Sequence, residues 1–176
     1  IFTFSNIPYG EYLIKELKPA DGYLDNEDVF TVTIKNNEQV VELTAINDKV
    51  PELKTTATVN GKKEVIAKGE ITIKDTVEYK HLVPNTEYVI KGTLMDKATG
   101  KPFKVKGKEI TSTVKFVPDK ADGKVEVTFT FDGSAIKKDT ELVVFETLYR
   151  DGVELTAHAD INDDGQTVTV RPYIPH

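Results

Sequence analysis

The chain has 176 residues, enough for one large domain or two small ones. Its net charge of −6 at pH 7 excludes the basic footprint of a nucleic-acid-binding protein, so we expect no nucleic-acid partner. The absence of cysteine excludes disulfides, thiol catalysis and cysteine metal sites, and no apolar run is long enough to insert into a membrane.

The first 50 residues consist of strand and turn patterns. Apolar or alternating segments cover residues 2–4, 10–17, 29–35 and 39–46. In two of these stripes a polar residue continues the apolar face, Glu16 in one and Asn47 in the other. Strand ends that emerge into solvent also explain both residues. Because the chain begins inside a strand-like pattern, we expect it to be a piece of a longer protein.

The second part of the chain follows a short linker at Asp48-Lys-Val-Pro51, and it shows no internal repeat of the first part. Short strands alternate with Gly, Asn and Asp turns, and no stretch shows a sustained helical period. This spacing predicts an all-β protein with antiparallel Ig-like sandwich or barrel domains in tandem, residues 1–50 and 51–176. The predicted strands of the second domain are residues 55–60, 64–77, 86–95, 111–117, 125–131, 141–149, 153–161 and 167–173.

Four polar residues of the second domain are predicted to face its core. Thr55, Asp75, Glu146 and Gln166 each share strand parity with neighbouring apolar residues. Buried polar side chains require partners, so this set either forms a hydrogen-bonded group or carries chemistry.

The chemistry that fits these residue types is an acyl transfer within the chain. A threonine hydroxyl that attacks a glutamine carboxamide forms an ester and releases ammonia, which requires a base, an acid and oxyanion donors. His158 is the candidate proton carrier, and Glu146 and Asp75 are candidates to orient it or to share a proton. Simple alternation turns His158 away from the apolar stripe, so a bulge or a strand end must redirect it.

Two further patterns resemble binding sites. Asp160-Ile-Asn-Asp-Asp-Gly165 matches the first half of a calcium loop, but its twelfth position is Arg171 and its flanks are strands, which favours an acidic turn. The basic row of Lys104, Lys106 and Lys108 on one predicted strand face is typical of a solvated edge. We therefore expect no metal and no cofactor.

Residues 51–176 resemble the VaFE-type repeat domains of Gram-positive surface proteins, which are the ester-bond-crosslinked stalk domains of adhesins. The motifs that carry the resemblance are Pro51-Glu-Leu-Lys-Thr55-Thr-Ala, Asp75-Thr-Val, Gly92-Thr-Leu-Met-Asp, Val143-Val-Phe-Glu146, His158-x-Asp160 and Gln166-Thr-Val. The resemblance implies an autocatalytic ester between Thr55 and Gln166, assisted by His158, Glu146 and Asp75. Thr56 is the rival nucleophile, and strand parity favours Thr55.

Residues 1–50 resemble the C-terminal half of a CnaB/SpaA-type pilin domain. The carriers are Phe4-Ser-Asn-Ile-Pro-Tyr-Gly-Glu-Tyr-Leu-Ile-Lys-Glu16, Pro19-Ala-Asp-Gly-Tyr23 and Leu43-Thr-Ala-Ile-Asn47. In that family a buried glutamate, here Glu16, promotes an isopeptide bond between a lysine and an asparagine, here Asn47. The strand that bears the lysine is absent from this sequence, so the resemblance implies a lysine supplied in trans or by another segment.

Together these patterns predict a stalk segment of a cell-wall-anchored bacterial surface protein, whose partners are the adjacent domains of the same protein. A ligand-binding adhesin head is the alternative, although the sequence has no tryptophan and no large exposed apolar run. A hydrolase that uses His158 and Glu146 is the third interpretation, and it requires a cleft open to solvent.

Overall fold

The computed structural model describes residues 6–15, 21–24, 29–41 and 48–175. The chain divides into two compact units, Ile1–Val50 and Pro51–His176. Among the described residues the elements are strands and two short 3-10 turns, so the all-β prediction is confirmed. None of the described elements is a helix of the length and hydrophobicity required to cross a membrane.

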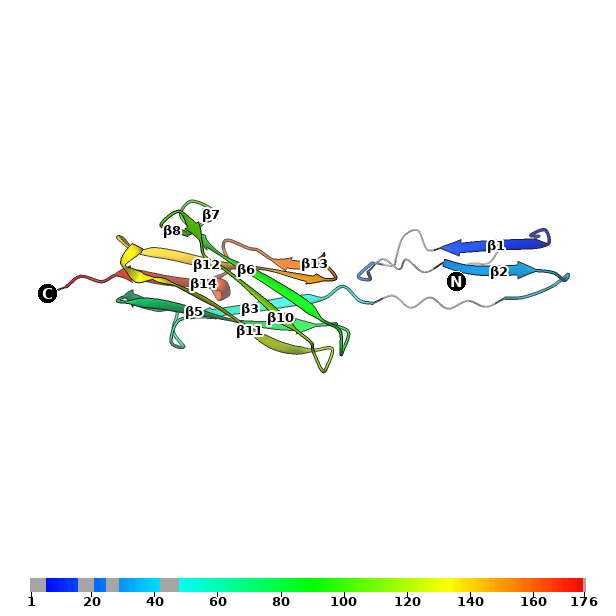
Figure 1. The fold of residues 1–176 in the computed structure, drawn as a ribbon, viewed down its shortest axis with the longest axis horizontal. Helices are drawn as coiled ribbons and strands as arrows, with labels where there is room; N and C mark the ends of the chain where they lie inside the picture. Colours follow the sequence, from blue (N-terminus) through cyan, green and yellow to red (C-terminus); the bar gives the residue numbers. More distant parts are fainter. Residues whose placement is uncertain (1–5, 16–20, 25–28, 42–47, 176) are drawn as a thin grey trace. The chain divides into compact units, whose positions relative to one another are not determined.

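The described part of the first unit is built on one antiparallel pair of strands, β1 (Gly10–Lys15) and β2 (Val29–Ile34) (Figure 1). A second backbone pairing joins residues 22–24 to residues 48–50, where Leu24 N donates to Asp48 O and Val50 N donates to Gly22 O. After β2 the Gln39 side chain accepts a hydrogen bond from the backbone N–H of Lys35 and donates one to Thr33 O. Glu16, Asn47 and most of the predicted strand 39–46 lie outside the described residues.

The larger sheet of the second unit has the order β10-β6-β12-β14-β4, with β7 paired to β6 and β13 paired to β12 (Figure 1). Its members are β4 (Glu64–Ala67), β6 (Tyr88–Asp96), β7 (Lys101–Pro102), β10 (Thr111–Phe116), β12 (Thr140–Arg150), β13 (Val153–His158) and β14 (Thr167–Pro172). One edge of β12 pairs with β6, and its other edge pairs with β14 along residues 140–143 and with β13 along residues 146–150.

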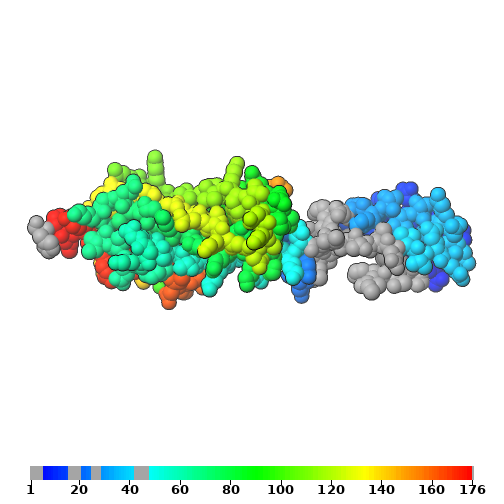
Figure 2. Space-filling view, turned by 90° about the horizontal axis from the view of Figure 1, so that it is seen from below, coloured from blue at the N-terminus to red at the C-terminus, as the bar shows by residue number. Residues whose placement is uncertain are grey.

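The smaller sheet contains β3 (Glu52–Thr58), β5 (Glu70–Lys80) and β11 (Gly123–Asp132), in the order β11-β5-β3. Its outer face, the teal to yellow-green surface in Figure 2, carries exposed charges such as the Lys74–Glu126 pair at 3.9 Å. Its inner face shares one apolar core with the larger sheet, so the unit is a two-layer sandwich. The core contains Ile73, Val77 and Phe129 from one layer and Ile90, Leu94, Leu142, Leu148 and Val168 from the other.

The first and last strands of this unit belong to opposite layers. The chain leaves β3, turns at Asn60-Gly61, and enters β4, which runs parallel to β14 in the larger sheet. The single strand predicted for residues 64–77 is therefore wrong. Gly69 adopts φ 73° between β4 and β5, and this left-handed turn sends the chain back to the smaller sheet.

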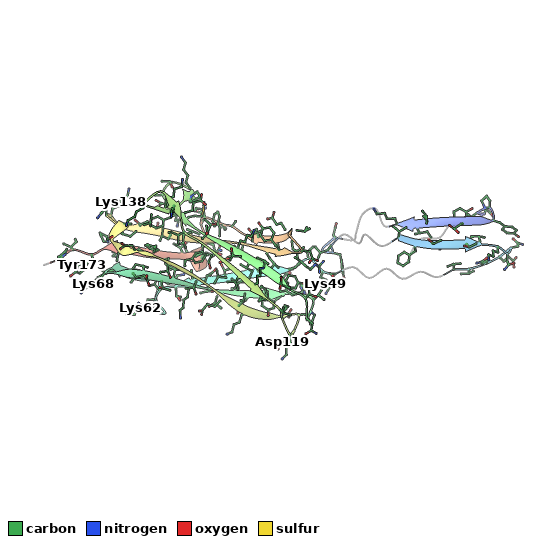
Figure 3. The ribbon with its side chains drawn as sticks, in the orientation of Figure 1. Lys49, Lys62, Lys68, Asp119, Lys138 and Tyr173 are labelled. Atoms are coloured by element: carbon green, nitrogen blue, oxygen red, sulfur yellow. The ribbon has the colours of Figure 1, made fainter. Side chains whose placement is uncertain are left out.

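The predicted lysine row is also different from the observed structure. Lys104 lies in β8 (Lys104–Val105), Lys108 lies in β9 (Lys108–Glu109), and Lys106 with Gly107 forms the turn between them. The three lysines thus belong to a small hairpin instead of one strand face. The ammonium of Lys68, which lies between β4 and β5, is 5.2 Å from the ring centroid of Tyr173 near the C-terminus (Figure 3).

Candidate functional site

The four polar residues predicted to face the core are buried between the two sheets. Thr55 is 2% exposed, and Asp75, Glu146 and Gln166 are fully buried. Thr55 and Asp75 come from the smaller sheet, Glu146 comes from the larger one, and Gln166 comes from the 3-10 turn that directly precedes β14 of the larger sheet. The sandwich therefore brings together side chains that are up to 111 positions apart in sequence.

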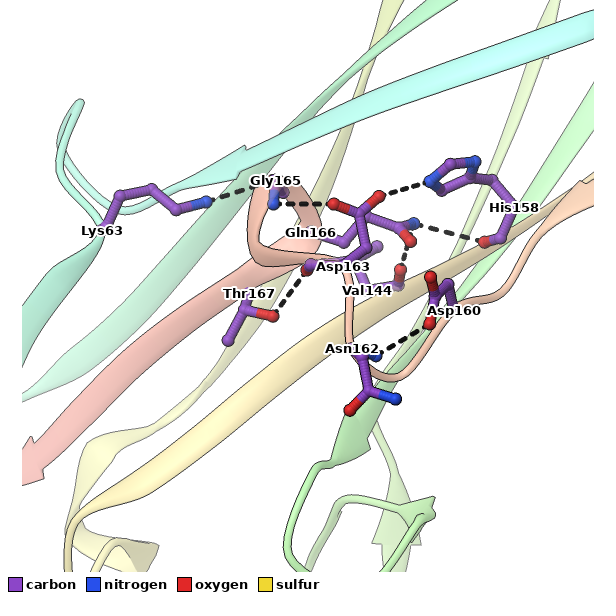
Figure 4. Close-up of polar contacts among 9 residues, drawn as sticks. All are labelled: Lys63, Val144, His158, Asp160, Asn162, Asp163, Gly165, Gln166 and Thr167. Atoms are coloured by element: carbon purple, nitrogen blue, oxygen red, sulfur yellow. Dashed lines mark hydrogen bonds and ion pairs between the residues drawn. The ribbon is translucent and has the colours of Figure 1, made fainter.

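Gln166 fills a gap in the backbone pairing of β12. The β14 ladder ends at Val143–Thr167 and the β13 ladder begins at Glu146–His158. In this gap the Gln166 carboxamide nitrogen donates to Val144 O and, at 3.2 Å, to His158 O (Figure 4). Gln166 itself is the last residue of the 3-10 turn η2 (Asp164–Gln166), directly before β14, and it is buried as strand parity predicted.

Thr55 occupies the edge strand that packs against this turn. Its cross-strand partner in β5 is Val77, and Asp75 is the diagonal neighbour on the same inner face. The backbones of β3 and η2 lie close together. A Cβ atom added at Gly165 would be only 3.3 Å from Thr55 O. The rival Thr56 is exposed on the outer face, so only Thr55 points its hydroxyl towards the core.

Asp75 and Glu146 form a buried carboxyl pair. Burial raises the pKa of Glu146 to about 10, with further contributions from the hydrogen bond and the charge of Asp75. Burial also raises the pKa of Asp75, and the hydrogen bond from Glu146 opposes that rise. Two ionised carboxylates would have no donor between them, whereas one shared proton joins them, so the pair holds a proton at neutral pH.

His158 lies beside this pair because β13 contains a bulge. Leu148 pairs with Thr156 and Tyr149 pairs with Glu154, which leaves Leu155 as an extra residue. The bulge places His158 directly opposite Glu146, and residues opposite each other in an antiparallel pair share a face. The placement expected from simple alternation was wrong, and the alternative of a bulge is the one observed.

Asp163 holds the imidazole of His158 in place. His158 Nε2 lies 2.6 Å from Asp163 Oδ2, and Gly165 N donates to Asp163 Oδ1 at 2.8 Å (Figure 4). The hydrogen bond from His158 is the main cause that lowers the pKa of Asp163. An ionised Asp163 accepts a hydrogen bond from Nε2–H, which leaves Nδ1 as the basic nitrogen of a neutral ring.

The hydrogen-bonding deficit of the described core is confined to this group. Apart from the proton shared by the carboxyl pair, six buried side-chain oxygens there have no hydrogen-bond partner, and all belong to Thr55, Asp75, Glu146 and Gln166. Native cores satisfy nearly all buried polar atoms, so such a concentration of exceptions points to a reactive group of side chains. A nucleophile, an amide carbonyl and a protonated carboxyl pair are the components of an acyl transfer.

A comparison with protein families agrees with this chemistry. The family model described as "T-Q ester bond containing domain" matches residues 51–170, which is more than half of the chain. The chain belongs to this family. A second model, described as "Prealbumin-like fold domain" (SpaA), matches residues 1–49. Both motif-based resemblances, to ester-crosslinked domains and to SpaA-type domains, are confirmed.

The solved structures similar to this chain include a bacterial adhesin from Mobiluncus mulieris, in two crystal forms, described as containing intramolecular disulfide, isopeptide and ester bond cross-links. The TM-score is 0.61 for both, at 21% and 20% sequence identity, over 71% of this chain. The match covers 58% of the adhesin chain, so this chain spans less than two thirds of its length. At this identity the likeness establishes a shared fold. No curated protein matches the chain.

The acidic loop of this ester bond domain uses its carboxylates within the loop itself. Asp160 Oδ1 accepts the N–H of Asn162 at 2.9 Å, and Asp163 caps η2 (Figure 4). Within the described residues no three His, Cys, Asp or Glu side chains are grouped to hold a metal ion.

Three residues around the site were not assigned a role from the sequence. Asp163 was noted only as part of the acidic turn, Lys63 was not singled out, and Gly92 appeared only within a motif. Their contacts depend on long-range packing, which strand parity does not encode. Gly92 lies opposite Glu146 in the β6–β12 pair, and it leaves space for the carboxyl group of Glu146.

Replacing Gly92 with alanine is expected to destabilise the ester bond domain by about 1–3 kcal/mol through overpacking. The added Cβ would lie 2.5 Å from Phe129 Cζ and 2.8 Å from Glu146 Oε2, so both core side chains must shift. Urea unfolding in a Thr55→Val background measures the loss. Thr113→Ala, an exposed change on the paired strand β10, is the control and should stay within about 0.5 kcal/mol. Equal stability of the two variants would contradict the expectation.

Proposed function

We propose that this chain is a stalk segment of a bacterial surface adhesin and that its second domain crosslinks itself through an ester between Thr55 and Gln166. The observation that carries the proposal is the group of six buried oxygens on Thr55, Asp75, Glu146 and Gln166, which have no hydrogen-bond partner outside the carboxyl pair. Membership of the T-Q ester bond family and a shared fold with an adhesin described as containing ester bond cross-links support it.

The proposed reaction joins two side chains and releases one ammonia. Thr55 Oγ1 attacks the carboxamide carbon of Gln166, a C–O bond forms, and the C–N bond breaks. The hydroxyl proton of Thr55 passes to the departing nitrogen, so the chain and the released ammonia balance without another reactant. Burial of both groups in one core supplies the effective concentration that free side chains lack.

The surrounding groups have separate roles in this proposal. The proton shared by Asp75 and Glu146 stabilises the oxyanion that develops on Gln166 Oε1. His158, oriented by Asp163, carries the proton from the nucleophile to the leaving nitrogen. The leaving nitrogen is fixed by its two carbonyl acceptors, Val144 O and His158 O. No cofactor is required.

The bond would tie together the two layers of the sandwich. Thr55 lies on the first strand, in the smaller sheet, and Gln166 directly precedes the last strand, in the larger sheet. Closing a loop of this length stabilises the folded state by about 4–5 kcal/mol through the entropy of the unfolded chain. Such a link gives a cysteine-free extracellular domain resistance to unfolding and to proteases.

The site does not suit turnover of an external substrate. All four central residues are at most 2% exposed, so a substrate from solution has no access to them. Each chain consumes its own glutamine, so we assign the domain a single self-crosslinking event and no enzymatic activity. This burial disfavours the hydrolase that was considered for His158 and Glu146.

The rest of the proposal concerns the setting of the segment. We place it at the cell surface, anchored to the cell wall through other parts of the protein, with adjacent domains of the same chain as its partners. In residues 1–50 an isopeptide bond to Asn47, promoted by Glu16, would require a lysine from another segment or another chain.

Intact mass spectrometry under denaturing conditions tests the crosslink. The unaltered protein should weigh about 17 Da less than its sequence because one ammonia is lost. Gln166→Ala and Thr55→Val should each abolish the deficit. Thr56→Val, the same change at the exposed neighbour, is the matched control and should retain it. A full mass for the unaltered protein would overturn the proposed function, and a deficit that persists in Thr55→Val would exclude Thr55 as the nucleophile.

A further inference from the structure

Lys63 contacts three segments that surround the site. Its ammonium donates to Ala57 O at 2.6 Å. It also donates to Gly165 O at 3.1 Å (Figure 4). Its own backbone carbonyl accepts the N–H of Thr169 at 2.8 Å. A single lysine in the turn before β4 therefore joins the end of β3, the turn η2 and the strand β14.

The two carbonyls bound by Lys63 lie next to the reacting residues. Ala57 follows Thr55 by two positions, so the two residues share the inner face of β3. Gly165 directly precedes Gln166 in η2. Among the described strands, β3 pairs with β5 and not with β14, so the backbone ladder does not fix the distance between Thr55 and Gln166. The Lys63 ammonium bridges these two segments.

The charge of Lys63 also suits its position. Burial lowers its pKa, and the negative charges of Asp75, Asp163 and Asp164 oppose that shift. The negative charge of Asp163 raises the pKa of Asp75, and the positive charge of Lys63 lowers it. A cation between the acidic turn and the core carboxylate therefore reduces the repulsion that would separate η2 from the smaller sheet.

We propose that Lys63 is a positioning residue for the crosslinking reaction, which clamps β3 to η2 before the ester forms and so holds the Thr55 hydroxyl against the Gln166 carboxamide. The inference rests on the proposed ester. Lys63 binds only backbone carbonyls beside the reacting groups, so its effect is on their alignment. Removing the ammonium should slow ester formation by about ten- to a hundredfold, the cost of a small misalignment of reacting groups.

The test follows the ammonia loss of newly made protein over time. The full chain is produced by cell-free synthesis, samples are quenched in denaturant, and intact mass gives the fraction converted at each time. Lys63→Met keeps the length of the side chain without its donors. Lys63→Arg keeps several N–H donors and should react within about threefold of the unaltered rate. Lys62→Met is the matched control, since Lys62 lies exposed on the same turn (Figure 3).

A parallel measurement separates alignment from stability. Lys63→Met is placed in the Thr55→Val background, where no ester can form, and its folded fraction is determined by urea unfolding. Slow conversion of a fully folded Lys63→Met chain, with normal conversion of Lys62→Met, supports the clamp. Unaltered protein that never loses ammonia overturns the proposed function and the clamp together. Normal conversion of Lys63→Met, or a delay that its unfolded fraction explains, overturns the clamp alone.

Discussion

Stretching the Thr55→Val variant from both ends is expected to release roughly 390 Å more chain than stretching the unaltered protein, since 111 peptide steps separate Thr55 from Gln166 and each spans about 3.5 Å when extended. In the unaltered protein the proposed ester would carry the load directly from β3 to the turn before β14. The residues between these points then bear no tension and stay folded.

The strand topology explains why the Thr55→Val variant is expected to unfold under load. β3 and β14 lie in opposite sheets and share no backbone ladder, so without the ester the load passes through side-chain packing between the layers. Among the described strands β3 is also an edge strand that pairs only with β5, and such a strand can separate one residue at a time.

Single-molecule force spectroscopy of the full chain measures this difference as a gain in contour length. Thr56→Val, which changes the exposed neighbour of Thr55, should behave as the unaltered protein does. If the unaltered protein also releases the long segment, no covalent bond connects the first strand to the last, and the proposed mechanical role fails.

The sequence predicted the members of the site better than their arrangement. Thr55, Asp75 and Glu146 lie on regular strands, where a period of two residues assigns each side chain to a face, and all three are buried as expected. Parity also predicted the burial of Gln166, although this residue ends a 3-10 turn. These predictions needed only local patterns.

The features that were wrong or missing depend on interactions across the fold. The bulge at Leu155 puts His158 on the face opposite to the one that simple alternation predicts. A single sequence does not show where one strand has an extra residue relative to its partner strand. The hydrogen bond from Lys63 to Gly165 spans 102 positions of the sequence. The parallel pairing of β4 with β14 joins residues at a similar separation in sequence. Local alternation cannot specify contacts of this range, so the face of His158 and the contacts of Lys63 could be found only in the structure.

The stability of the uncrosslinked domain is expected to fall as pH rises from 7 to 9. The pKa of Glu146 is about 10 in the folded protein, against an ordinary value of 4.5, because burial and the neighbouring Asp75 favour its protonated form. Between these two values the folded state binds more protons than the unfolded state. The stabilising contribution of Glu146 is therefore complete below pH 4.5 and is lost progressively towards pH 10.

Urea unfolding of Thr55→Val at several pH values measures this loss. One full proton corresponds to a slope of about 1.4 kcal/mol per pH unit, and removing both carboxyl groups with Asp75→Asn and Glu146→Gln in the same background should leave a much flatter profile. The pKa of Asp163 is shifted in the opposite direction, below its ordinary value of 3.8, so its contribution is lost only in acid and does not affect this range. An equally steep decline after both substitutions would show that the carboxyl pair is not the group that titrates. The proposal that a proton shared by Asp75 and Glu146 stabilises the oxyanion would then lose its support.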